Sequence, residues 1–206
     1  MFHIRIKGKL EDEKEITKSE LPSDAKVFDE GDSLQDAFTR AFLVSVPVIL
    51  LVIICSILRL RPIAQNTAMN MKLFSISFVI TMILSIGLRY LHEIIHALCY
   101  PLHSVKEIWN YKRNGAYLVY CDAKVSKSKF IWINLAPNIV LGGLPFIIWL
   151  LIADRLPTHI TVCSVFLLWY MILGGMVDYY NIYNTIKQVP KDAHIFNYGP
   201  HSYWIG

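Results

Sequence analysis

The residues with the clearest chemical potential are two histidines and a glutamate in the run HEIIHALCYP. His92 and His96 are four residues apart, so on a helix their imidazoles lie on one face, one turn apart, and both can bind one cation. Glu93 follows the first histidine and can reach a water at that cation. Zinc lowers the pKa of such a water to about 7, and a carboxylate then takes its proton as the water attacks a carbonyl. The motif predicts zinc-dependent hydrolysis.

The same residues also allow an interpretation without metal. In it, a helix ends at a membrane surface and its polar groups reach out to water. Two imidazoles and a carboxylate at the end of an apolar helix are costly to bury unless they are paired, which favours the metal. The four cysteines form no Cys-x-x-Cys pair, so the sequence offers no cysteine zinc site.

The segments that must position these residues are long and apolar. Hydrophobic residues make up 54% of the 206-residue chain and gather in uncharged runs long enough to cross a bilayer. We therefore expect an α-helical polytopic membrane protein, with a polar N-terminal segment at 1–37 and a membrane domain at 38–206. Its four spans lie near 41–58, 73–99, 130–153 and 157–178, and a tail follows at 179–206.

The placement of basic residues predicts the orientation of these spans. The chain up to Arg40, the loop after the second span and the tail together carry 15 Lys and Arg residues, whereas the opposite side carries four. The positive-inside rule then places both termini and the middle loop in the cytoplasm of a multi-pass cell-membrane protein. The net charge of +4 is too small and dispersed to indicate a nucleic-acid partner.

A zinc site of this kind needs a third protein ligand and leaves a fourth position for water. The second and fourth spans run in the same direction, so Asp178, at the cytoplasmic end of the fourth, should lie level with the histidines. Gly174 and Gly175 just before it would allow close helix packing. The alternative for Asp178 is an ordinary interfacial acid. Weaker candidates for the third ligand are Asp122 in the middle loop, Asp154 on the opposite side and His103 beyond Pro101.

The middle loop has the pattern of a β-hairpin. Asn114-Gly115 separates the runs KEIWNYKR and AYLVYCDAKV, and Asn-Gly between two such runs is the strongest short hairpin signal. Such a hairpin would present an edge near the membrane. An extended peptide substrate could pair with that edge by strand addition. A structural lid without a substrate is an equally good interpretation.

Three segments of the chain resemble a bacterial family of zincin-type membrane peptidases, which is related in plan to the site-2 proteases. They are HEIIHALCYP at 92–101, the hairpin that leads into NLAPNIVLGG at 134–143, and GGMVDYYNIYNTIKQVPKDAHIFNYG at 174–199. The resemblance covers residues 73–206. It implies a zinc ion bound by His92, His96 and Asp178, with Glu93 as the general base.

One departure from the site-2 protease pattern concerns the third span. There, an Asn-Leu-x-Pro run leads into Leu-Asp-Gly, whose aspartate is the third zinc ligand. Here Asn134 and Pro137 are present, but Gly142 stands near the place of that aspartate. The third ligand must therefore come from elsewhere, and Asp178 is the preferred choice. Asn134 is either a hydrogen-bond donor to a substrate backbone or a helix–helix contact.

The sequence as a whole predicts a zinc metalloendopeptidase that hydrolyses peptide bonds of membrane proteins near the cytoplasmic face. Its partners would be the lipid bilayer and a membrane-protein or peptide substrate. Two non-catalytic alternatives remain. One is a membrane protein that keeps a metal as a sensing element, and the other is an accessory or immunity-type protein that acts through helix contacts without metal.

Overall fold

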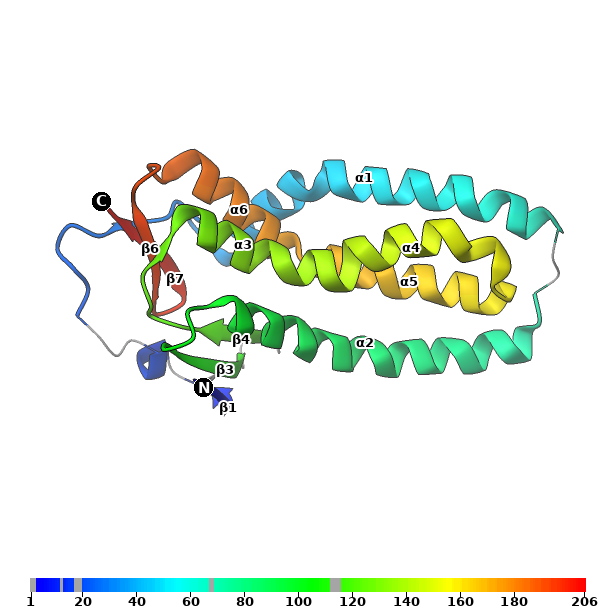
Figure 1. The fold of residues 1–206 in the computed structure, drawn as a ribbon, viewed down its shortest axis with the longest axis horizontal. Helices are drawn as coiled ribbons and strands as arrows, with labels where there is room; N and C mark the ends of the chain where they lie inside the picture. The colour runs from blue at the N-terminus through cyan, green and yellow to red at the C-terminus, as the bar shows by residue number, and fades with distance from the viewer. Residues whose placement is uncertain (1–2, 12, 17–19, 67–68, 112–115) are drawn as a thin grey trace.

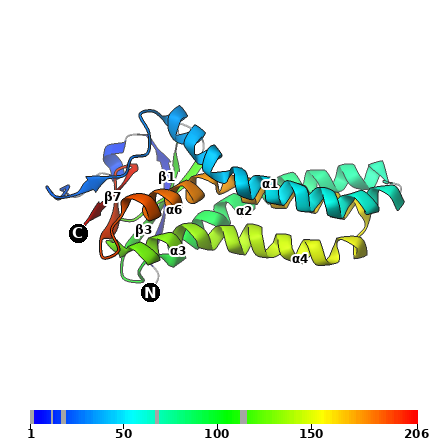
Figure 2. The ribbon, with the colours of Figure 1, turned by 90° about the horizontal axis from the view of Figure 1, so that it is seen from above.

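Four long helical segments form the body of the protein, and two small β-sheets lie at one end of it (Figures 1 and 2). The computed structural model describes residues 3–11, 13–16, 20–66, 69–111 and 116–206. The first two segments are α1 (Leu34–Asn66) and α2 (Met71–Cys99). The third consists of α3 (Lys127–Pro137), the π-helix η2 (Asn138–Gly143), α4 (Leu144–Ile152) and the short 3-10 helix η3 (Ala153–Arg155), and the fourth consists of α5 (Thr158–Gly174) and α6 (Met176–Gln188).

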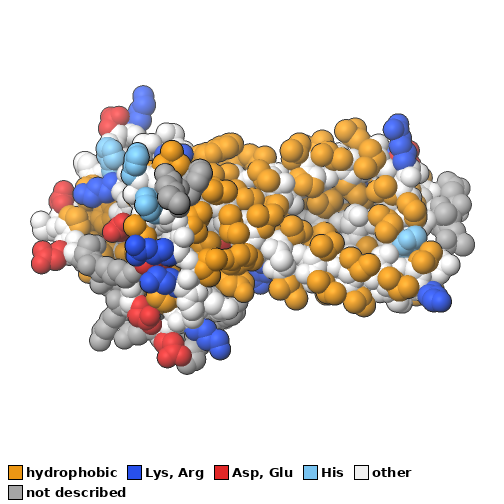
Figure 3. Space-filling view, turned by 60° about the horizontal axis from the view of Figure 1, so that its bottom comes forward, with side chains coloured by type: hydrophobic (Ala, Val, Ile, Leu, Met, Phe, Trp, Pro, Cys, Tyr) orange, Lys and Arg blue, Asp and Glu red, His pale blue; other side chains and the backbone are white. Residues whose placement is uncertain are grey.

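Each of these segments is long and apolar enough to cross a membrane. The apolar stretches are Gln35–Gln65, Met71–Cys99, Lys127–Arg155 and Thr158–Gln188. They include the first three expected spans and all but the first residue of the fourth. Only 17% to 39% of the most apolar part of each stretch is buried within the protein, so most of its side chains face outward. Figure 3 shows them as a hydrophobic belt between two ends that carry the charges. Such a surface fits contact with lipid and not with water.

The fourth segment continues well beyond the point where we expected the span to end. The prediction placed its end at Asp178. The structure has Asp178 in the first turn of α6, only 8% exposed and facing the other helices. Its charge is therefore kept away from lipid, and the helix continues to Gln188.

The first sheet lies beside the end of α2 and has the strand order β1-β3-β4. Its strands are β1 (His3–Leu10), β3 (Val105–Tyr111) and β4 (Ala116–Tyr120). β3 and β4 pair antiparallel over the two runs that were expected to form a hairpin, and β1 pairs with β3 in parallel. The Asn114-Gly115 turn itself lies outside the described residues. The 3-10 helix η1 (Glu13–Ile16) follows β1.

The second sheet was not anticipated. It has the order β2-β7-β6-β5, with strands β2 (Lys26–Val27), β5 (Val125–Ser126), β6 (His194–Tyr198) and β7 (His201–Ile205). Its centre is an antiparallel hairpin made by the tail, in which Gly199 has a φ of +59° between the two strands. Glycine is the residue that adopts this conformation without steric cost. Both ends of the chain lie at this end of the bundle (Figure 1).

The second sheet contacts the end of α2 through Tyr100. Tyr100, the residue after α2, is buried, and its hydroxyl oxygen accepts a hydrogen bond from Asn197 Nδ2 of β6 at 3.1 Å. Burial raises the pKa of Tyr100 well above its ordinary value, so this phenol stays neutral. Tyr100 belongs to a hydrophobic cluster that joins the helix ends to the second sheet; its other members are Phe28, Cys121, Val125, Phe130, Ile133, Val189, Ala193 and Ile195.

Candidate metal centre

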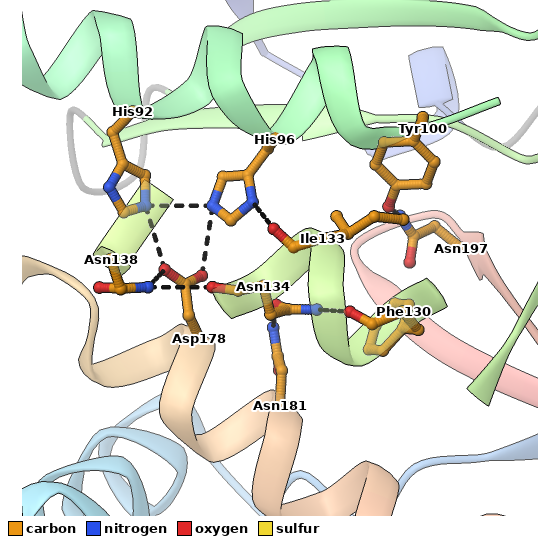
Figure 4. A network of polar contacts seen from close by, with 10 residues as sticks. All are labelled: His92, His96, Tyr100, Phe130, Ile133, Asn134, Asn138, Asp178, Asn181 and Asn197. Atoms are coloured by element: carbon orange, nitrogen blue, oxygen red, sulfur yellow. Dashed lines mark hydrogen bonds and ion pairs between the residues drawn. The ribbon is translucent and has the colours of Figure 1, made fainter. Parts of the chain in front are cut away.

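The two histidines of the HEIIH run face the interior of the bundle from α2. Each residue is 8% exposed, and their Nε2 atoms are 3.0 Å apart (Figure 4). The four-residue spacing on a helix produces this arrangement, because it places both side chains on one face. The helix therefore aims two ring nitrogens at a single point.

Asp178 reaches the same point from α6. Its Oδ2 is 3.0 Å from His92 Nε2, and its Oδ1 is 3.4 Å from His96 Nε2. The three potential ligand atoms all lie within 4.8 Å of one another, and all three residues are buried. Asp178 follows His92 by 86 residues, so the folding of α6 beside α2 assembles the group. The structure thus brings together the two histidines and the acid that the topology argument selected.

The chemistry of the donor set fits a bound cation. His96 Nδ1 lies 2.8 Å from the carbonyl oxygen of Ile133, which can only accept, so Nδ1 carries the proton. The Nε2 atom of a neutral His96 then presents a lone pair toward the Asp178 carboxylate. A lone pair and a carboxylate repel each other, so either a proton or a metal ion must lie between them. Metal-binding histidines commonly donate their second ring N–H to a carbonyl in this way, and two imidazoles with one carboxylate are a ligand set that suits zinc.

Asn138 is a part of the site that sequence reasoning missed. Its Nδ2 donates to Asp178 Oδ2 at 2.7 Å and to the backbone oxygen of Asn134 at 2.9 Å (Figure 4). The residue is only 5% exposed. A neutral donor on one carboxylate oxygen restrains the orientation of Asp178, as outer partners of metal ligands do.

A local change of helix geometry brings Asn138 to this position. Asn138 begins the π-helix η2, in which the Leu144 N–H donates to the Ile139 oxygen, five residues earlier. Pro137 precedes it and has no N–H to donate. Short π-helical segments inside α-helices often occur at functional sites, because the extra residue redirects side chains.

Gly175 provides the space that Asn138 needs. A Cβ added at Gly175, between α5 and α6, would overlap Asn138 Oδ1, so any other residue there would displace the Asn138 amide. Among the described residues, Oδ1 has no hydrogen-bond partner. Close packing was predicted for both glycines. It holds for Gly175, but a Cβ added at Gly174 would have no atom within 4 Å of it.

Asn134 makes one hydrogen bond within α3 and one to α6. Its Nδ2 donates to the Phe130 oxygen at 2.9 Å, and its Oδ1 accepts from Asn181 Nδ2 of α6 at 3.0 Å. These bonds engage both ends of the amide, so the structure fits the packing interpretation of Asn134. Gly142, near the place of the missing aspartate, packs against Ile172 of α5, where an added Cβ would lie 2.8 Å from Cγ1.

Glu93 occupies a different environment from its two histidine neighbours. Its side chain is half-buried. Within the described part of the chain, the Glu93 carboxylate makes no hydrogen bond or ion pair. It is therefore free to accept a proton beside the His92–His96–Asp178 group.

The weaker candidates for a third ligand lie elsewhere. Asp154 forms an ion pair with Arg59 at the opposite end of the bundle. His103 and Asp122 are exposed in the segments after α2 and β4. Across the residues that the structure describes, His92, His96 and Asp178 are the one group of three or more His, Cys, Asp or Glu side chains placed to hold a metal ion.

Comparisons with known proteins agree with the chemistry of this group. Residues 85–194, slightly more than half of the chain, match the model of a family described as "Putative zincin peptidase". The matched stretch contains all three residues of the metal group, together with Glu93 and Asn138. No curated protein and no solved structure matches the chain. The chain belongs to this zincin peptidase family.

Proposed function

We propose that the protein is a zinc-dependent membrane metalloendopeptidase that hydrolyses peptide bonds of membrane proteins. The observation that carries the proposal is the convergence of His92, His96 and Asp178 on one buried point, with the Glu93 carboxylate of the same helix unengaged beside it. The family match of residues 85–194 supports it independently. The three residues of the group would hold the zinc ion.

Each residue has a distinct role in this proposal. A bound zinc ion supplies Lewis acidity that polarises the scissile carbonyl and acidifies the attacking water. Glu93 takes a proton from that water as the water oxygen bonds to the carbonyl carbon. The same carboxylic acid then gives the proton to the leaving amine as the C–N bond breaks. Asn138 holds the Asp178 carboxylate, and the Ile133 oxygen fixes the orientation of the His96 ring.

The site would act near one membrane surface. His92 and His96 lie in the last two turns of the long helix α2, close to the sheet end of the bundle. Both chain ends and most of the basic residues are at that end, so we place it in the cytoplasm by the positive-inside rule. The proposed cleavage is therefore on the cytoplasmic side.

A route for the substrate follows from the first sheet. In the described residues, β4 pairs only with β3, so no strand pairs with its other edge. The Tyr117 ring of β4 packs against the ring of Tyr90 in α2, and their centroids are 5.5 Å apart. Tyr90 precedes His92 by two residues. We propose that an extended substrate segment pairs with this edge and so passes close to the metal group.

The test compares the wild-type protein with Glu93→Gln, which keeps the three zinc-binding side chains. Both are expressed in bacterial membranes, and newly formed N-termini of membrane proteins are labelled and identified by mass spectrometry. The proposal predicts termini that occur only with the wild type and disappear with Glu93→Gln. The same termini in both samples would exclude Glu93 catalysis. Zinc binding with no new termini in either sample would instead favour a non-catalytic metal protein.

A further inference from the structure

Arg89 is a charged residue inside the apolar belt that the proposed reaction does not use. The 16 residues before it in α2, Leu73–Leu88, contain no charge, and the Arg89 side chain is exposed. Its Nη1 donates to the Tyr170 hydroxyl of α5 at 3.4 Å. Its charge also acts on the Glu93 carboxylate, one helical turn further along α2, but among the described residues no carboxylate lies within ion-pair distance of the guanidinium. A charged side chain within a membrane helix is costly, and it usually has a function.

The position of Arg89 relates it directly to the metal group. Arg89 precedes His92 by three residues and Glu93 by four, so all three lie along one face of α2. Tyr170 precedes Asp178 by eight residues in the neighbouring segment. The Arg89–Tyr170 contact is therefore a second bridge between the helices that make the His92–Asp178 contact, displaced toward the middle of the bundle.

This displacement argues against two simpler roles. An arginine that reaches for lipid headgroups should lean toward the nearer membrane surface. The bond to Tyr170 holds the guanidinium away from the sheet end, and side chains of α2 lean in that direction, toward its N-terminus. A purely structural arginine would be expected to have its donors satisfied within the protein, whereas this one is exposed and its bond at 3.4 Å is long.

We propose that Arg89 and Tyr170 form a carboxylate-binding subsite that seats an acidic group of the peptide substrate beside the metal centre. The guanidinium has further N–H donors after its bond to Tyr170, and it can bind a carboxylate with two parallel hydrogen bonds. The Tyr170 hydroxyl has its own proton to donate. The carboxylate is either an acidic side chain or the free C-terminus of the substrate. The inference rests on the proposed function.

The charges around the metal group explain why Arg89 would determine the preference for an acidic substrate. Glu93 and Asp178 are both carboxylates, so without Arg89 an acidic group close to the centre would meet repulsion. Arg89 is the cation on the same face of α2. We therefore expect substrates to be selected for an acidic group near the scissile bond.

Binding of model peptides tests the subsite without any hydrolysis. The protein carries Glu93→Gln, is kept free of zinc with a chelator and is held in zwitterionic nanodiscs. The probe is a fluorescein-labelled Leu/Ala single-span peptide in three forms: a neutral C-terminal amide, a free C-terminal carboxylate, and the amide with one glutamate at successive positions. Fluorescence anisotropy gives the affinity of each form. Comparison of the second and third forms identifies the source of the carboxylate.

We expect at least one carboxylate peptide to bind about tenfold more tightly than the neutral amide. Arg89→Gln should abolish this preference, Arg89→Lys should retain part of it, and Tyr170→Phe should reduce it. Arg155→Gln, at the other end of the bundle, is the matched control and should keep it. Size-exclusion profiles and thermal melts of the variants separate loss of binding from loss of fold.

Three outcomes would overturn the subsite. The first is equal or absent binding of all the peptides, and the second is a carboxylate preference that survives Arg89→Gln. The third is a preference that disappears when phosphatidylglycerol is added, because Arg89 would then be a ligand for lipid headgroups. Because the assay uses neither zinc nor Glu93, failure of the hydrolysis proposal leaves its result unchanged. Loss of the preference would likewise leave the hydrolysis test unaffected.

Discussion

Asn138 Nδ2 lies 2.7 Å from Asp178 Oδ2, so a residue of the π-helix in the third segment holds the acid of the candidate metal group. The same oxygen is 3.0 Å from His92 Nε2. Asp178 is thus fixed between an amide and an imidazole. This relationship makes the third segment, which supplies none of the three ligand side chains, part of the centre.

Removal of this amide should weaken zinc binding while leaving all three ligands present. Asn138→Ala should lower zinc affinity about 10- to 100-fold, the range found for outer partners of metal ligands. Competition with a fluorescent zinc chelator measures the change. Asn181→Ala is the control, because the Asn181 side chain donates its hydrogen bond to Asn134 and not to a metal-group residue. Wild-type affinity in Asn138→Ala would show that Asp178 needs no such support.

Gly175 and Gly174 provide a matched pair for the same idea. An alanine methyl at position 175 would overlap Asn138 Oδ1, whereas one at position 174 would have nothing within 4 Å. Gly175→Ala should therefore displace the Asn138 amide and lower zinc affinity by about tenfold or more. Gly174→Ala should bind zinc as the wild type does. Equal affinities in the two variants would contradict the proposed role of Gly175.

Lys106 should contribute to stability by closing the end of α2. Its side chain is fully buried, and Nζ donates to the backbone oxygens of Pro101 and Leu102. Lys106→Met keeps most of the side-chain volume and leaves these carbonyls unpaired, which should cost about 1–3 kcal/mol. Thermal unfolding in detergent measures the loss, with the exposed Lys191→Met as control. If both variants melt with the wild type, Lys106 has no such role.

The proposed orientation predicts which loops a membrane-impermeant maleimide can reach in whole cells. In a background without the native cysteines, Asp154→Cys should be labelled from outside, because η3 lies at the end opposite the sheets. Asp122→Cys, which is exposed beside the first sheet, should be labelled only after the membrane is opened. The reverse pattern would place the metal centre on the outer side and refute the cytoplasmic cleavage proposal.

The spacing of the two histidines and the direction of the apolar spans were enough to predict that the three metal-group residues lie together. A four-residue interval fixes the relation of His92 to His96, and the parallel course of two apolar runs places Asp178 at their depth. The segment around Asn114-Gly115 had a similar local signal for paired strands. Each of these predictions depends on short intervals or on whole spans, which a single sequence displays directly.

Other parts of the structure have no comparable signal. Asn138 reaches Asp178 because η2 is a π-helix, and a sequence-based reading treats the third span as one regular helix. β2 and β5 are two residues long and join a sheet with strands far along the chain, so no local pattern marks them. The β6–β7 hairpin is an exception. Gly199-Pro200 separates two short aromatic runs and is a turn signal, but the prediction placed no strands in the tail.

Zinc content of the purified protein tests the central claim most directly. The wild type should contain about one zinc ion per chain, as expected for a single site with three protein ligands. His92→Ala and Asp178→Ala should lose the metal, whereas His103→Ala and Asp154→Ala, which alter residues outside the group, should retain it. A wild-type protein that takes up no zinc when supplied with it, or an Asp178→Ala variant that binds zinc as tightly as the wild type, would contradict the account.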